Sequence, residues 1–266
     1  MNNKTDIRYL GWSNIIVSSS QGSLAFDPFY RPMYGAKWAS LEDYKDVKVI
    51  CISHGHHEHY LDTPNVVKYT NAKVVSSKEV CEHLNKKYKV PKENLIPVSP
   101  FEEVTVEGFK ITPFPWYHRK ISYLKFFQGN LITGMTFGLL NLFKSPYNAP
   151  YYGFYIESPD GLKLLNFTEG LNNLFPTEEM EELGAKFKPS VLVGGMQLHY
   201  ENDVARAVRA IAPQTFIMYH PHEKLFGSMK IKSSSPEIFV ARVKEAAPQV
   251  EVVLPEPMSF VQVDNN

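Results

Sequence analysis

Residues 54–59 carry the clearest chemical signal in this chain of 266 residues. Four imidazoles and one carboxylate lie within six positions there, in the order HGHHEH. Neutral imidazole and carboxylate are the usual protein ligands of zinc, iron and manganese. His54 and His56 are two residues apart in an extended segment, so their side chains point to the same side. Glu58 and His59 follow after the chain turns and can face a second point nearby. We expect a metal site here, and a solvated polar turn is the alternative.

A buried strand delivers this cluster, because residues 47–52 are rich in β-branched side chains. More metal-type side chains follow other predicted strands: Asp27, His118, Glu169, His199 and His220. Open α/β architectures collect functional residues at one edge of their sheets, on loops held by a rigid scaffold. Asp27 is either a carboxylate that orients a ligand histidine or a turn-forming residue before Pro28.

Short strands and helices alternate along the whole chain. We predict strands at 7–10, 14–17, 23–26, 47–52, 72–76, 95–98, 104–106, 109–112, 151–157, 162–167, 190–193, 215–218, 250–254 and 259–263. Helices are predicted at 63–70, 77–88, 176–183, 203–211 and 236–247. Residues 29–45 are aromatic-rich and predict an irregular loop that forms one wall of a pocket. With no repeat or linker, we expect one α/β domain over 1–266, with an apolar insertion at about 119–150.

Composition excludes several classes of protein. Basic and acidic residues balance at 28 each, which gives no electrostatic footprint for nucleic acid. Hydrophobic residues make up 44% of the chain, enough for a sizeable core. The first residues lack the apolar segment of a signal peptide. The two cysteines, Cys51 and Cys81, have no metal-motif spacing, which indicates reduced thiols and a cytoplasmic location.

The stretch 126–143 contains no charged residue. Its length just reaches that of a membrane span, but it holds three glycines and three polar amides. A single crossing would also place His118 and Glu169 on opposite sides of a bilayer, so we reject a span. The flanking lysines favour a lid or a peripheral contact with anionic lipid. A buried hairpin or an oligomer contact is the alternative.

The histidine cluster and its partners resemble a known superfamily. HGHHEH is similar to the His-x-His-x-Asp-His signature of the metallo-β-lactamase superfamily, and His118, Glu169 and His220 follow in that family's order. The resemblance covers nearly the whole chain and implies an αββα sandwich of two mixed β-sheets flanked by helices. The segments YLGWSN and LHYENDVARAV are most similar to the branch of ascorbate-phosphate lactonases and N-acyl-phosphatidylethanolamine phospholipase D.

Carried over residue by residue, the resemblance implies two divalent metal ions. His54, His56 and His118 would bind one, Glu58, His59 and His220 would bind the other, and Glu169 would bridge them. Zinc is the first expectation, with manganese and iron as alternatives. Glu58 and Glu169 stand where the family has aspartate, and each extra methylene adds about 1.5 Å of reach. Asp62 is an alternative source of a carboxylate.

The implied activity is hydrolysis of an ester, lactone or phosphodiester by a metal-bridging hydroxide. Glu58 and His199 are the candidate catalytic residues, with His199 holding substrate or donating a proton; a polar residue beside a helix is the alternative. His57 and His222 are expected to lie behind the ligands or at the surface. The two glutamates also raise the alternative of a di-iron oxygenase, and a non-catalytic binding protein is a third. The aromatic loop and the apolar insertion favour a small-molecule or lipid substrate.

Overall fold

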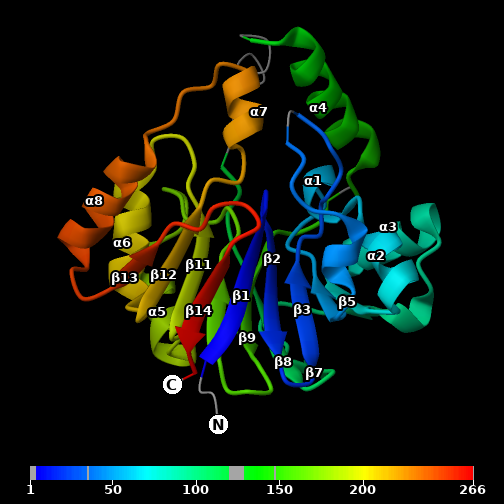
Figure 1. Ribbon diagram of the computed structural model, residues 1–266, viewed down its shortest axis with the longest axis horizontal. Helices are drawn as coiled ribbons and strands as arrows, with labels where there is room; N and C mark the ends of the chain where they lie inside the picture. The colour runs from blue at the N-terminus through cyan, green and yellow to red at the C-terminus, as the bar shows by residue number, and fades with distance from the viewer. Residues whose placement is uncertain (1–3, 35, 120–128, 147, 266) are drawn as a thin grey trace.

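Two seven-stranded mixed sheets form the centre of the molecule, as Figure 1 shows. The computed structural model describes residues 4–34, 36–119, 129–146 and 148–265. The first sheet contains, in spatial order, β14 (Phe260–Asp264), β1 (Lys4–Gly11), β2 (Asn14–Ser19), β3 (Gly22–Phe26), β4 (Val47–Cys51), β5 (Lys73–Ser76) and β6 (Leu95–Pro97). Pairing is antiparallel from β14 to β3 and parallel from β3 to β6.

The second sheet has the same mixed character. It contains, in spatial order, β13 (Glu251–Val253), β12 (Thr215–Tyr219), β11 (Val191–Gly195), β10 (Lys163–Asn166), β9 (Tyr152–Glu157), β8 (Phe109–Pro115) and β7 (Val104–Val106). Strands β7 to β10 pair antiparallel, whereas β10 to β13 pair parallel. Parallel pairing places the carboxyl ends of neighbouring strands side by side, and the candidate site residues follow such ends, except His118, which follows the antiparallel strand β8.

Alternating side chains divide the core into three layers. Along β4, Val49 and Cys51 face the second sheet, whereas Ile50 and Ile52 face outward into another cluster. Strands buried on both faces carry near-continuous apolar runs, which explains why the sequence predicted them so well. The layer between the sheets joins residues of both, such as Phe26 and Phe154.

Helices cover both outer faces and complete the sandwich. The first sheet is covered by α2 (Thr63–Thr70) and α3 (Lys78–Tyr88). The second sheet is covered by α5 (Thr177–Phe187), α6 (Glu201–Ile211) and α8 (Pro236–Ala246). Short helical turns occur at η1 (Leu41–Tyr44), α1 (His57–Tyr60) and η2 (Lys92–Asn94). The expected αββα architecture is therefore confirmed.

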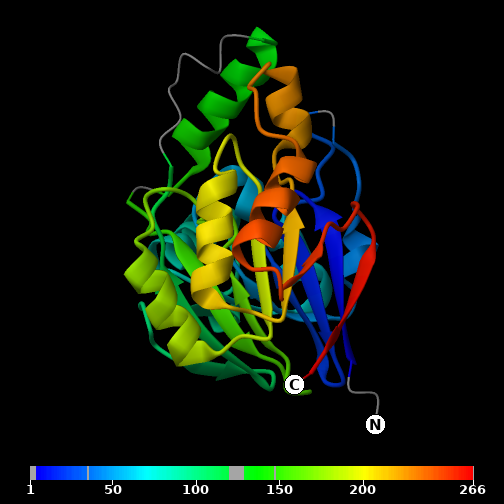
Figure 2. The same ribbon diagram turned by 90° about the vertical axis from the view of Figure 1, so that its left-hand side faces the viewer.

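Two further helices lie at the end of the sandwich opposite the chain termini, as Figures 1 and 2 show. They are α4 (Leu131–Lys144) and α7 (Glu223–Ser228). The amide of Asn130 donates to the carbonyl of Ser228 over 2.9 Å, which joins the start of α4 to the end of α7. The hairpin alternative for the uncharged stretch is wrong over residues 131–144, which are helical. Residues 120–128 and 147 of the expected insertion lie outside the described residues.

No helix in the described ranges is long and apolar enough to cross a membrane.

Candidate metal centre

Asp27 anchors the turn that carries the histidines. Strands β3 and β4 run parallel with Phe26 opposite Cys51, so Asp27 and Ser53 lie next to each other. The buried Asp27 carboxylate accepts hydrogen bonds from the amide and the hydroxyl of Ser53, each over 2.7 Å. Its Oδ2 also accepts from Nδ1 of His59 over 2.9 Å. Asp27 therefore orients a histidine, as the first interpretation expected, and the role of His59 as a metal ligand stays a prediction.

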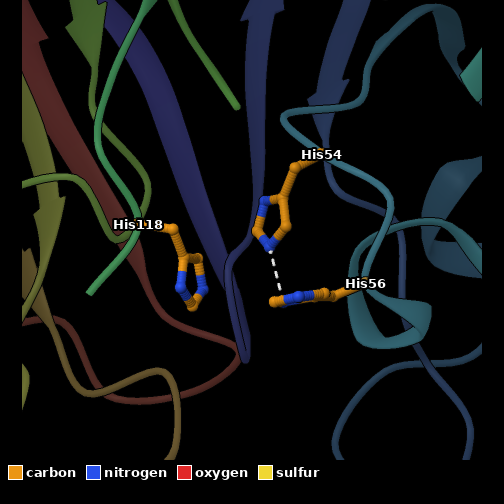
Figure 3. A group of neighbouring side chains, drawn as sticks. All are labelled: His54, His56 and His118. Atoms are coloured by element: carbon orange, nitrogen blue, oxygen red, sulfur yellow. Dashed lines mark hydrogen bonds between the residues drawn. The ribbon is translucent and has the colours of Figure 1, made fainter. Parts of the chain in front are cut away.

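Three histidines converge on one point, as Figure 3 shows. His54 and His56 come from the turn after β4, and His118 follows β8 on the other sheet. One ring nitrogen from each lies within 4.8 Å of the other two, and Nε2 of His54 is 3.0 Å from Nδ1 of His56. Two nitrogens on a tetrahedral zinc ion stand about 3.3 Å apart, given Zn–N distances of ~2.0–2.1 Å. The spacing therefore suits a divalent cation.

Hydrogen bonds fix the orientation of two of these rings. Nδ1 of His54 lies 2.9 Å from the Ser53 hydroxyl oxygen, and Nδ1 of His118 donates to the Arg119 carbonyl over 2.7 Å. With Nδ1 occupied, each ring presents Nε2 to the shared point, as is usual for ligand histidines. Trp116 stacks on His118 with ring centroids 5.6 Å apart and restricts its rotation. The group of His54, His56 and His118 is called the tri-histidine group below.

A second group surrounds the buried Glu169. Its Oε1 lies 3.4 Å from Nε2 of His59 and 3.1 Å from Nε2 of His222. Its Oε2 lies 3.1 Å from Nη1 of Arg119 and 3.9 Å from Nε2 of His118. These contacts bring together α1 and the loops that follow β8, β10 and β12. Glu169, His59, His222 and Arg119 are called the glutamate group below.

The structure brings His222 to this group, whereas the sequence analysis placed His220 there. Nε2 of His220 lies 3.4 Å from the Ser233 hydroxyl, and its Nδ1 is buried without a hydrogen-bond partner. Pro221 separates the two histidines, and the backbone turn it makes into α7 aims His222 at Glu169. The sequence HPH offers two histidines in the right order, but only the backbone direction after the proline distinguishes them. We therefore replace His220 with His222 among the proposed ligands.

Glu58 and His57 form the link between the turn and α4. Nδ1 of His57 lies 3.0 Å from Oε2 of Glu58 and 3.0 Å from Oδ1 of Asn141 on α4. Nε2 of His57 lies 2.8 Å from the Tyr34 hydroxyl. Glu58 is itself buried, and its Oε2 has no hydrogen-bond partner of good geometry. Glu58 thus stands beside the two groups, and its role as ligand or catalyst stays a prediction.

Asp62 and His199 have other partners. Both oxygens of the buried Asp62 accept hydrogen bonds from Tyr30 and Arg31, so Asp62 holds the aromatic loop. It therefore replaces neither glutamate. His199 is exposed, and its Nδ1 lies 2.9 Å from the Ser234 hydroxyl. Its proposed part in substrate binding stays a prediction.

The histidines of the two groups differ in their pKa values. Burial, together with neighbouring histidines, lowers the pKa of His54 and His118, the latter to about 3. Burial likewise lowers the pKa of His222 to about 4. Burial would also lower the pKa of His59, but the carboxylates of Asp27 and Glu169 outweigh it and raise this pKa to about 10. The tri-histidine group is therefore neutral at pH 7 and has lone pairs to offer a cation.

The donor atoms of the tri-histidine group fit a metal ion. One ring nitrogen from each of its three neutral histidines lies within 4.8 Å of the other two, whereas in the glutamate group the buried Oε1 of Glu169 already pairs with His59 and His222. Imidazole nitrogens and carboxylate oxygens together suit zinc, manganese and iron.

The comparisons with known proteins agree with this chemistry. The family described as the beta-lactamase superfamily domain matches residues 23–147. A UPF0173 metal-dependent hydrolase from Methanopyrus kandleri is 24% identical over 255 residues, which cover 94% of this chain and 96% of that protein.

Solved structures show the same fold. A metallo hydrolase from the archaeon Ignicoccus hospitalis superimposes with a TM-score of 0.70 at 20% identity, covering 98% of this chain and 99% of that one. A diiron β-hydroxylase from Streptomyces venezuelae superimposes with a TM-score of 0.61 at 12% identity, covering 99% of this chain and 55% of that one. With its two mixed sheets and its histidine-rich turn, the chain has the metallo-β-lactamase fold, its residues 23–147 match the beta-lactamase superfamily domain, and it is similar along nearly its whole length to metal-dependent hydrolases.

Proposed function

We propose that this protein is a metal-dependent hydrolase that cleaves an ester, lactone or phosphodiester. The observation that supports this most is the convergence of ring nitrogens from His54, His56 and His118 within 4.8 Å. A divalent cation held there would lower the pKa of water towards neutrality and polarise a carbonyl or phosphoryl oxygen. The protein's own part is to fix the three rings through Ser53 and the Arg119 carbonyl.

The experiment is a substrate panel on protein stripped of metal and reloaded with zinc, manganese or iron in turn. We expect hydrolysis of at least one ester, lactone or phosphodiester by the reloaded protein, and loss of that activity after chelation. Reloaded protein that hydrolyses none of the three classes would contradict the proposal. A His83→Gln variant serves as the matched histidine control, because His83 contacts Tyr60 and lies in α3, outside both groups.

The surface of α4 supports a lipophilic or acyl-bearing substrate. Six large apolar side chains of this helix are exposed: Leu131, Ile132, Met135, Leu139, Leu142 and Phe143. Ile132 also lines a groove of about 440 Å³ together with Met33, Tyr34 and Thr136. The groove joins α4 to the aromatic loop, whose Tyr34 contacts His57 in the imidazole turn. An apolar chain lying in this groove would contact Tyr34, which lies next to His57 at the edge of the metal centre.

An Ile132→Ser variant tests this substrate class. We expect activity on long-chain substrates to fall several-fold while activity on short-chain substrates of the same headgroup is unchanged. Ile238→Ser, at an exposed position on α8, is the control and should change neither. An equal loss on long and short substrates would count against an acyl-binding groove.

The same exposed residues support a peripheral contact with anionic membranes. Residues 108–156 contain no acidic side chain but include four lysines and one arginine. An exposed apolar helix in a basic segment favours the surface of an anionic bilayer. Co-sedimentation with anionic but not neutral vesicles, weakened by Leu142→Asp, is the expected result. A concentration-dependent dimer that Leu142→Asp dissolves would instead favour the oligomer contact.

A di-iron oxygenase is the second candidate function. It is favoured by the buried carboxylates of Glu58 and Glu169 beside the histidines, because carboxylate-rich sites suit iron. The structurally similar β-hydroxylase is described as a diiron protein. Elemental analysis and an optical spectrum of aerobically purified protein separate the candidates. Zinc without oxo-bridge absorption would end the oxygenase hypothesis, whereas two irons with that absorption would support it.

The two cysteines support a cytoplasmic location, since both are free and buried.

A further inference from the structure

Arg119 places a permanent positive charge inside the glutamate group. Its side chain is 3% exposed, and Nη1 donates to Oε2 of Glu169 over 3.1 Å. Its Cζ lies 5.9 Å from the centre of the Phe226 ring. Among the described residues it is the one lysine or arginine that is buried. A guanidinium in that setting is held by its carboxylate partner and stays charged at any working pH.

The position of this guanidinium affects what Glu169 can bind. A carboxylate that bridges two cations must turn an oxygen toward each of them. Oε1 of Glu169 faces His59 and His222, and Oε2 is the oxygen that lies 3.9 Å from His118 in the tri-histidine group. Arg119 occupies Oε2. A cation that bound this oxygen would have to share it with Arg119 and would lie next to the positive charge of the guanidinium.

The charge balance of the buried site points the same way. Three carboxylates are buried around the two groups: Asp27, Glu58 and Glu169. Arg119 already compensates one of these three negative charges, that of Glu169. A second divalent cation would leave an excess of positive charge in a region of low dielectric, next to a guanidinium that repels it.

We infer that this protein binds one divalent metal ion, at the tri-histidine group, and that the guanidinium of Arg119 takes the place of a second one. Arg119 then acts as a positioning residue that fixes Glu169 beside His118. Its Nε is buried without a hydrogen-bond partner and remains able to donate. The inference rests on the proposed metal centre and replaces the expectation of two ions with one.

Metal stoichiometry tests this inference independently of catalysis. Dialysed protein loaded with excess zinc is measured by mass spectrometry of the metal, as wild type, Arg119→Gln and Arg119→Lys. We expect one ion per chain in wild type and in Arg119→Lys, which keeps the charge, and two ions in Arg119→Gln. Arg206→Gln is the control, because Arg206 bonds Phe175 and Thr177 elsewhere, and should bind one ion.

Two ions in wild type, or one ion in a folded Arg119→Gln, would overturn the inference. Zero ions in every variant would instead mean that the proposed metal centre is wrong. Electron paramagnetic resonance of manganese-loaded wild type provides a test that needs no variant to fold. An uncoupled single-ion signal at saturation is expected, and a spin-coupled pair would contradict one ion per chain.

Discussion

The tri-histidine group and the glutamate group lie side by side, yet they differ in charge. In the first, burial keeps His54 and His118 neutral, and hydrogen bonds to Nδ1 leave their Nε2 atoms directed at one point. In the second, Glu169 already contacts the cationic Arg119, and His59 carries a raised pKa between two carboxylates. The first group offers lone pairs to a cation, whereas the second is already largely compensated by the protein.

Removing a ring from the tri-histidine group should have the largest effect. We expect His54→Ala to lower kcat/KM by about a thousandfold or more, because the cation loses a ligand and its fixed position. Steady-state kinetics on the substrate identified by the panel measures this loss, with His83→Gln as the folded histidine control. Retention of more than a tenth of wild-type activity by His54→Ala would show that the group is not the reaction centre.

Comparing the two histidines around Pro221 sharpens the definition of the glutamate group. His222 contacts Glu169 at 3.1 Å, whereas His220 contacts Ser233. We expect His222→Ala to lower kcat/KM by about 10- to 100-fold, the range seen when groups supporting a metal centre are removed. His220→Ala should change it less than a few-fold. Equal losses, or a larger loss for His220→Ala, would restore the assignment made from sequence.

The pH dependence of stability in metal-free protein should show a smaller effect. His118 and His222 have pKa values near 3 and 4 when folded, because they are buried, and ordinary values near 6.5 when unfolded. Below pH 6.5 the unfolded chain therefore binds protons that the folded chain does not. The free energy of unfolding should fall by up to ~1.4 kcal/mol per pH unit for each histidine between pH 6.5 and 4.5.

His59 has the opposite sign, because its folded pKa of about 10 lies above its unfolded value. Its contribution is complete below pH 6.5 and is lost as pH rises towards 10. Metal-free protein should therefore be most stable near pH 6.5, as urea unfolding at a series of pH values would show. Stability that rises steadily from pH 5 to pH 9 would contradict these charge states.

Much of this architecture could be predicted from local sequence patterns. The strands around 47–52 and 215–218 follow from their apolar runs, because both faces of these strands are largely buried, and the helix at 63–70 follows from the proline in its first turn. Asp27 was identified because a carboxylate at a strand end is well placed to orient a histidine. The prediction of residues around 54–59 and 118 needed only residue types and their order.

Other features depend on three-dimensional direction, which local patterns do not contain. The choice between His220 and His222 depends on how the chain leaves Pro221. Arg119 gave no signal, because a basic residue after a histidine is usually exposed, and only the fold places it against Glu169. Helix α4 carries apolar residues on an exposed face. Its sequence therefore lacks the alternation of apolar and polar faces that identifies a helix packed on a core.

Metal analysis of dialysed protein is the most direct test of the tri-histidine group. Wild type supplied with zinc, manganese or iron and then dialysed should retain one divalent ion per chain. His118→Ala should lose it, while His83→Gln should retain it. Wild-type protein that stays free of metal when ions are supplied in excess, or a His118→Ala variant that retains as much as wild type, would contradict a cation held by these three rings.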